Sequence, residues 1–274
     1  METGLVERFK AMLKRGGQEL FEDNRERMTC ADLLETRHMI ADDDLRRFFL
    51  GLDCGTVTIV RGARFNTLDR PIAGGRWGLL SREKRGCRYN AEYLSQIAAY
   101  VEAIHELGYP SGRVFFELPP TALKLDLAIV TDDGAIAIVG EAKRAVVMLD
   151  AILAEIQNRY STTDPGEEGR NEARQLAWRL WRTRAPYLWF IGPAERRTYR
   201  VSYEPLAFEA LPALPPAKDL GLAHVPARPI AIPVLRRRQS PNTYQAPGCQ
   251  EKKPVRPREP RSSRVRATAR RSGP

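Results

Sequence analysis

Residues 125–143 read Leu-Asp-Leu-Ala-Ile-Val-Thr-Asp-Asp-Gly-Ala-Ile-Ala-Ile-Val-Gly-Glu-Ala-Lys, and this segment predicts the centre of the fold. Two apolar runs, Leu125 to Val130 and Ala135 to Val139, flank a Thr-Asp-Asp-Gly sequence that is typical of a β-hairpin turn. Apolar residues occupy both alternating faces of each run, so we expect the hairpin to be buried on both sides. The first charged residues after the turn are Glu141 and Lys143.

The length of the turn decides which residues of the hairpin face each other. A two-residue loop at 133–134 places Asp126 directly opposite Glu141, and Lys143 then projects from the same face. A three-residue loop would shift the register by one and separate the two acids. With the two-residue loop, one face carries Asp126, Ala128, Val130, Ala137, Val139 and Glu141, and the other carries Leu127, Ile129, Ile136 and Ile138.

Two carboxylates that face each other on adjacent strands repel, because their side chains lie only about 5 Å apart. A divalent cation would offset this repulsion, since hard oxygen ligands suit Mg²⁺ or Mn²⁺. Such a cation polarises a phosphate and lowers the pKa of bound water, and Lys143 beside it could orient that water. We therefore expect a site for phosphodiester hydrolysis in which Asp126 and Glu141 hold metal. The alternative is a strand that simply leaves the core with a charged end.

The segments around the hairpin predict a mixed α/β domain. Apolar residues at helical spacing predict a helix over 91–107, after which Val114 begins a strand. Further helices are expected over 147–160 and 171–182, followed by a strand over 187–191. The expected order is therefore helix, three strands, helices, strand.

Asp126, a gap of fourteen residues and Glu141-Ala142-Lys143 resemble the motif of the PD-(D/E)XK nuclease superfamily. The resemblance covers about residues 91–191 and implies an α/β fold with a restriction-endonuclease-like α-β-β-β-α-β core and a mixed central sheet. It also implies a Mg²⁺-dependent nuclease, with Mn²⁺ as a substitute, in which Asp126, Glu141 and Lys143 are catalytic. DNA is the expected substrate, and its products would carry 5′-phosphates.

Two positions depart from the family's pattern. Leu125 stands where the family's proline would be, and Gln157 to Tyr160 only approximates the Gln-x-x-x-Tyr motif of one branch. Many members place a further acid near the metal. Glu92 on the first helix and Glu117 at the end of the next strand are the candidates for such a metal ligand, and the alternative for each is a solvated carboxylate.

We expect four parts: an N-terminal mixed, mainly helical subdomain at 1–88, the nuclease-like core at 89–204, a proline-rich extended linker at 205–235 and a basic tail at 236–274. The formal net charge is +10, and the tail alone holds twelve basic and two acidic residues, so the remainder is neutral. The tail has almost no large apolar residue, which predicts disorder. It would bind nucleic-acid phosphates without sequence preference, or serve only to keep the chain soluble.

Three features are expected within the N-terminal part. Apolar residues from Leu5 to Leu13 predict an amphipathic helix that stops at Gly16-Gly17. Two short helices are expected between residues 31 and 50. The Gly- and Arg-rich run 61–88 would either contact nucleic acid or form a solvated loop anchored by Trp77.

Several classes of protein are disfavoured by what the sequence lacks. No apolar run reaches the roughly 20 residues needed to cross a bilayer, and the N-terminus has no secretory signal, so we expect a cytoplasmic protein without a membrane partner. The four cysteines are scattered, which argues against a zinc site or a disulfide framework. Three functions stay open: a metal-dependent nuclease acting on DNA, a noncatalytic nucleic-acid-binding or assembly module that keeps the same fold, or an adapter whose N-terminal helices dock a partner and whose tail supplies nonspecific charge. The sequence does not identify a protein partner.

Overall fold

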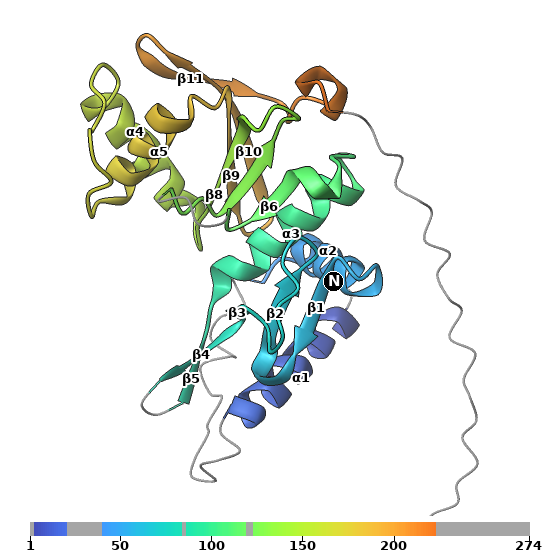
Figure 1. The fold of residues 1–274 in the computed structure, drawn as a ribbon. Helices are drawn as coiled ribbons and strands as arrows, with labels where there is room; N and C mark the ends of the chain where they lie inside the picture. The colour runs from blue at the N-terminus through green and yellow to red at the C-terminus, as the bar shows by residue number, and fades with distance from the viewer. Residues whose placement is uncertain (1–2, 21–39, 84–85, 119–122, 223–274) are drawn as a thin grey trace, which may run out of the picture. The chain divides into compact units, whose positions relative to one another are not determined.

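The computed structural model describes residues 3–20, 40–83, 86–118 and 123–222. These residues form a mixed α/β structure with five α-helices and a mixed six-stranded central sheet (Figure 1). Among the helices described, none combines the length and the apolar character needed to cross a membrane.

The six-stranded sheet contains one parallel pair of strands. Its strand order is β11-β10-β9-β8-β7-β6, and only β8 and β9 run parallel. A parallel connection needs a crossover, which helices α4 and α5 supply between these two strands. The elements concerned are β6 (Val114–Phe116), β7 (Leu127–Val130), β8 (Ile136–Ala142), α4 (Val146–Arg159), α5 (Glu172–Thr183), β9 (Tyr187–Gly192), β10 (Glu195–Tyr203) and β11 (Leu206–Leu211).

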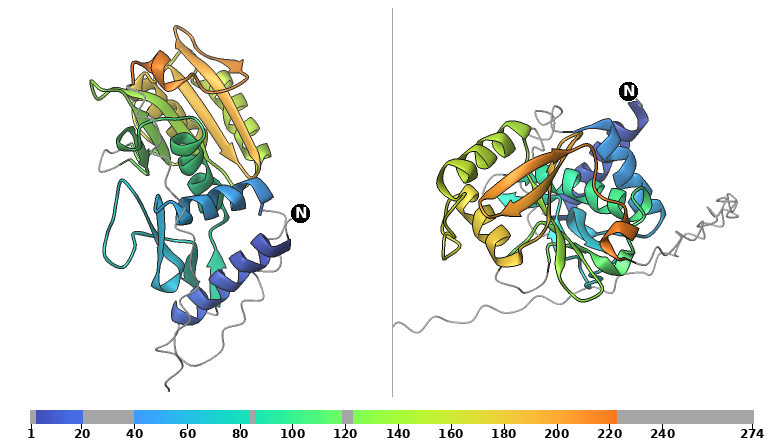
Figure 2. Two further views of the ribbon diagram at one scale, coloured as in Figure 1. Left: turned by 90° about the vertical axis from the view of Figure 1, so that its right-hand side faces the viewer. Right: turned by 90° about the horizontal axis from the view of Figure 1, so that it is seen from above.

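Helices cover both faces of this sheet (Figure 2). On one face, Leu127 and Ile129 join a cluster of buried apolar side chains that includes helix α3 (Ala91–His105). On the other, Ala128 and Val139 pack with buried residues of α4 and α5. The expectation that the β7–β8 hairpin is buried on both sides is therefore confirmed.

The N-terminal elements belong to the same buried cluster as α3. They comprise α1 (Thr3–Leu20), α2 (Asp42–Asp53), a three-stranded antiparallel sheet of β1 (Val57–Val60), β2 (Arg64–Thr67) and β3 (Trp77–Gly78), the 3₁₀ turn η3 (Arg61–Ala63), and the hairpin of β4 (Leu80–Glu83) and β5 (Gly86–Tyr89). Buried residues of α1, α2 and β1 to β5 contribute to the cluster that also contains Leu94 and Phe116. The apolar packing thus continues across residue 88, and the described N-terminal part holds five strands where mainly helices were expected.

The turn between β7 and β8 differs from the expected one, yet the register at the far end is as predicted. The Thr131 N–H donates to the Ala135 carbonyl, so the loop has three residues instead of two. Val130 consequently faces Ile136, one position away from the predicted pairing. A β-bulge then takes up one residue of β8, and Leu127 lies opposite Gly140 as predicted.

The bulge also corrects the predicted faces of the hairpin at two residues. Ala137 packs with Leu127 and Ile129, and Ile136 packs on the opposite side with Val130. The prediction had these two β8 residues exchanged because a regular alternation cannot accommodate an extra residue.

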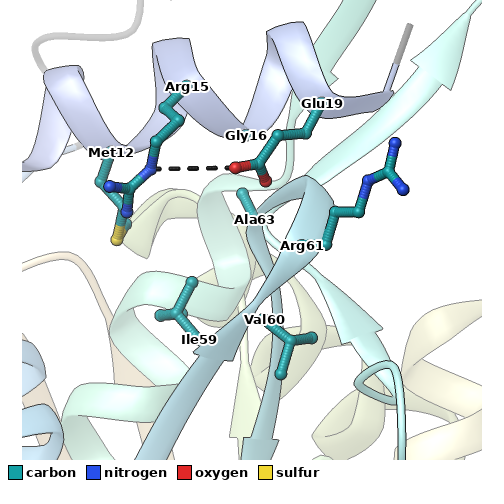
Figure 3. Close-up of a pocket in the computed structure, with 8 residues that line it drawn as sticks. All are labelled: Met12, Arg15, Gly16, Glu19, Ile59, Val60, Arg61 and Ala63. Carbon is teal, nitrogen blue, oxygen red and sulfur yellow. Dashed lines mark ion pairs between the residues drawn. The ribbon is translucent and has the colours of Figure 1, made fainter. Parts of the chain in front are cut away.

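Helix α1 continues through Gly16 and Gly17, so the predicted stop there is wrong. A Cβ atom built on Gly16 would lie 2.4 Å from the Ala63 Cβ and 2.7 Å from its nitrogen. Gly16 is therefore a point of close approach between the helix and η3, as Figure 3 shows. Glu19, one turn later, accepts a 2.7 Å hydrogen bond from the Gly62 N–H.

Strands β10 and β11 of the central sheet were not foreseen, and β11 lies where a linker was expected. Strand β11 begins at Leu206, inside the predicted 205–235 linker, and pairs with β10. Leu206 is buried and Phe208 packs beside it in the same cluster, so alternating apolar residues hold this strand on the sheet. The flanking prolines had concealed that alternation. The helix expected at 31–40 falls almost wholly outside the described residues, and the basic tail lies entirely outside them.

Candidate active site

The three residues of the predicted motif meet at one end of the β7–β8 hairpin. Asp126 and Glu141 each stand one residue beyond the Leu127–Gly140 pair. The Asp126 Oδ2 accepts a 2.8 Å hydrogen bond from the Ala142 N–H, which ties the carboxylate to the neighbouring strand. Lys143 follows on the same strand, and its N–H donates to the Ile191 carbonyl of β9.

Glu141 lies between two cations. Its Oε1 is 2.7 Å from the Lys143 Nζ, and its Oε2 is 3.0 Å from the Arg179 Nη1. Glu141 is only 3% exposed and Arg179 is 7% exposed, so the carboxylate and guanidinium are almost withdrawn from water. Arg179 of α5 is therefore a buried partner of Glu141.

Burial and neighbouring charges shift the pKa values of Asp126 and Lys143. Burial, followed by the neighbouring Glu141 charge, raises the pKa of Asp126 to about 8. Burial alone would lower the pKa of Lys143, but the Glu141 and Asp126 carboxylates outweigh it and raise that pKa. Lys143 therefore stays charged at neutral pH, while Asp126 is the acid whose charge a bound cation would stabilise most.

A cleft of about 670 Å³ opens beside this group. Its charged lining residues are the acids Glu92, Glu117, Asp126 and Glu172 and the arginines Arg88 and Arg144. The cleft therefore brings together Asp126 and both additional acids that the sequence had suggested. Glu141 and Lys143 are not among its lining residues, and their side chains are 3% and 11% exposed.

The two additional acids differ in how firmly they are held. Glu117 accepts hydrogen bonds from the Trp77 Nε1 at 2.5 Å and from the Tyr93 hydroxyl at 3.1 Å. Glu92 lies in the first turn of α3 and is half-buried. Two hydrogen bonds thus fix the position of the Glu117 carboxylate, whereas no such bond restrains Glu92 in the described structure.

The donor set suits a magnesium ion that keeps most of its water ligands. Among the described residues, no group of three or more acid, histidine or cysteine side chains is close enough to enclose a metal. Mg²⁺, however, is commonly bound through one or two carboxylates together with water and substrate phosphates. Asp126 and Glu141 provide such a pair, and a carboxylate retains free lone pairs after accepting two bonds.

Trp77 belongs to the core and not to a nucleic-acid surface. Its ring stacks on Phe65 at 5.6 Å and contacts Phe116 at 4.8 Å, measured between ring centroids. Trp77 therefore anchors the 61–88 run in the core, but the run forms η3 and β2 to β5 instead of a solvated loop, and contact of the run with nucleic acid stays a prediction.

Sequence reasoning missed Arg179 and Glu172 at this site. A signal for Arg179 does exist, because it lies three residues after buried Leu176 and so falls on the apolar side of α5. Glu172 carries no such signal, since an acid in the first turn of a helix is common for reasons of helix stability alone.

Comparison of the chain with protein-family models, with curated proteins and with solved structures returned no match. The functional argument consequently depends on the geometry of this site.

Proposed function

We propose that the protein is a metal-dependent nuclease that hydrolyses phosphodiester bonds in DNA. The observation that carries the proposal is the meeting of Asp126, Glu141 and Lys143 at one strand end, directly beside a cleft that Asp126 lines.

The order of elements supports the same proposal. Helix α3, strands β6 to β8, helices α4 and α5 and strand β9 follow each other in the order that the PD-(D/E)XK resemblance implies. The parallel β8–β9 pair makes the central sheet mixed, as that resemblance also implies. We therefore propose a restriction-endonuclease-like core, with the N-terminal elements and β10–β11 as additions to it.

Each residue has a distinct role in this proposal. Asp126 and Glu141 would hold the metal, with Glu92 or Glu117 as a further ligand. A bound divalent cation supplies Lewis acidity toward the phosphate and lowers the pKa of a bound water. Lys143 provides a fixed positive charge that orients the attacking water or stabilises charge on the phosphate. Arg179 keeps the Glu141 carboxylate in place.

The charge of the cleft gives the cation a second role. Four acids and two arginines line the cleft, so its formal charge is negative and it would repel a phosphate. The proposal therefore includes metal-dependent binding of the nucleic acid as well as metal-dependent cutting.

The alternative is a noncatalytic nucleic-acid-binding or assembly module with the same fold. One observation favours it: both oxygens of Glu141 are already paired, with Lys143 and with Arg179, so this acid is neutralised without a metal. Nucleic acid would then bind without being cut under any metal condition.

Cleavage of labelled linear, supercoiled and single-stranded DNA in Mg²⁺ or Mn²⁺ tests the proposal. We expect wild type to cut at least one form, and Asp126→Ala and Lys143→Ala each to lose at least about a hundredfold in rate. Lys218→Ala, which removes an exposed lysine of the 3₁₀ turn at 217–220, is the matched control and should cut normally. Binding without cutting of every DNA form and of RNA would favour the noncatalytic module.

A further inference from the structure

Three helices begin at the same cleft. Glu92 in the first turn of α3, Met148 in the first turn of α4 and Glu172 at the start of α5 all line it. The first N–H groups of a helix and its dipole favour negative charge nearby. Neither Asn90 at the start of α3 nor Ala145 at the start of α4 caps its helix through a side chain.

Two arginines stand on different elements of the cleft lining. Arg88 comes from the β4–β5 hairpin, and its side chain is 70% exposed. Arg144 comes from the segment between β8 and α4, and it is also exposed. Exposed arginines can rearrange to meet a ligand, and their planar guanidinium groups match the oxygens of a phosphate. The acid Asp126 lies in the lining that these arginines share.

The size of the cleft limits what can enter. A volume of about 670 Å³ is that of a pocket for a small ligand, with room for roughly one or two nucleotides. A double helix, whose major groove alone is about 12 Å wide, does not fit into such a volume. A single strand does, and its backbone would then pass Asp126.

We infer that the cleft binds a single strand of nucleic acid, with Arg88 and Arg144 contacting backbone phosphates on its way past Asp126. This inference rests on the proposed function and specifies its substrate as a single strand or an unpaired end. The start of α3, where Ala91 and Glu92 line the cleft, supplies N–H donors along the same path. The basic stretch after residue 235 adds affinity that is independent of these contacts.

The test is the affinity of the full chain for a fluorescein-labelled oligothymidylate, measured by fluorescence anisotropy in Mg²⁺ at several salt concentrations. All variants carry Lys143→Ala, so that binding is followed without cutting. Arg88→Ala and Arg144→Ala remove the proposed contacts. Arg200→Ala is the matched control, because Arg200 also lies on an antiparallel strand, is 57% exposed and pairs with Glu209 of the next strand at 3.1 Å, much as Arg88 pairs with Glu83 at 3.3 Å.

We expect Arg88→Ala and Arg144→Ala each to weaken binding about three- to tenfold and to reduce the slope of log affinity against log salt by about 0.7. Arg200→Ala should leave the slope unchanged. Equal effects of Arg88→Ala and Arg200→Ala would overturn this inference alone. So would equally tight binding of the same strand in a duplex, if Arg88→Ala weakened that binding by the same factor. Absence of binding to any nucleic acid would overturn the proposed function as well.

Discussion

Two of the groups of buried charged side chains in the described part of the chain differ in how completely their acids are satisfied. In the first group, Asp44 of α2 is fully buried and accepts bonds from the Arg196 Nη2 at 2.8 Å and the Ser95 Oγ at 2.7 Å. Its Oδ2 also accepts the Ala194 N–H at 3.3 Å. Both oxygens of Asp44 therefore have partners inside the protein.

In the second group, Asp126 accepts the Ala142 N–H and reaches an open cleft. Burial and Glu141 raise its pKa to about 8, so the folded protein holds its charge at a cost. The comparison teaches that buried ion pairs alone do not mark a functional site. What distinguishes the Asp126 group is an acid that remains partly unsatisfied beside a space that a ligand can enter.

The largest effect on stability is expected in the first group, which we call the closed group because both oxygens of Asp44 have partners inside the protein. Asp44→Ala would leave Arg196 buried beside Glu102 alone, and we expect it to lower the free energy of unfolding by about 3–5 kcal/mol. Urea denaturation measures this change. Asp43→Ala on the same helix removes an exposed acid paired with Arg46 and should cost under about 1 kcal/mol. Similar losses from the two substitutions would remove the distinction on which the comparison depends.

The second group, which we call the open group because Asp126 lines a cleft, should contribute to stability in a way that depends on pH. Because the pKa of Asp126 is raised, the folded state binds more protons than the unfolded state between about pH 4 and pH 8, and stability falls as pH rises through this range. Asp126→Asn cannot lose a proton and escapes this loss. We expect it to be about 1–2 kcal/mol more stable than wild type near pH 9, since exposure to the cleft moderates the full shift.

Melting temperatures of wild type and Asp126→Asn near pH 5 and near pH 9 check this expectation. The advantage of the variant should shrink toward acidic pH, where Asp126 is protonated in the wild type too. A constant difference across the range, or a variant that loses stability at alkaline pH, would show that Asp126 is not a costly charge.

The smallest effect is expected at the rim of the open group. Glu172 is half exposed, and its Oε2 lies 3.9 Å from the Lys143 Nζ. Glu172→Gln should therefore change the free energy of unfolding by under about 0.5 kcal/mol, measured by urea denaturation. A loss of several kcal/mol would mean that this acid belongs to a closed network like that of Asp44.

The sequence predicted those parts of the fold that depend on local pattern. Two apolar runs around a turn sequence located β7 and β8, and helical spacing located α3, α4 and α5 to within a few residues. The pairing beside Asp126 was predicted from a two-residue turn, although a three-residue turn and a compensating bulge produce it. A bulge depends on packing from both sides of the sheet, which local pattern does not record.

Long-range packing accounts for what the sequence could not supply. Gly16 lies against Ala63, forty-seven residues away in the sequence. From the sequence, a glycine at this position had indicated the end of the helix. Arg179 reaches Glu141 only because α5 packs against β8. The acids Asp126 and Glu141 could be predicted together since one hairpin carries both, whereas their partner on a later helix could not.

Uptake of Mn²⁺ by the full chain, followed by isothermal titration calorimetry, tests most directly the claim that the open group is a metal site. The account predicts a saturable site near pH 8 that is lost in Asp126→Ala and kept in Asp43→Ala, which removes an exposed acid elsewhere. No uptake by wild type, or equal uptake by Asp126→Ala, would contradict it.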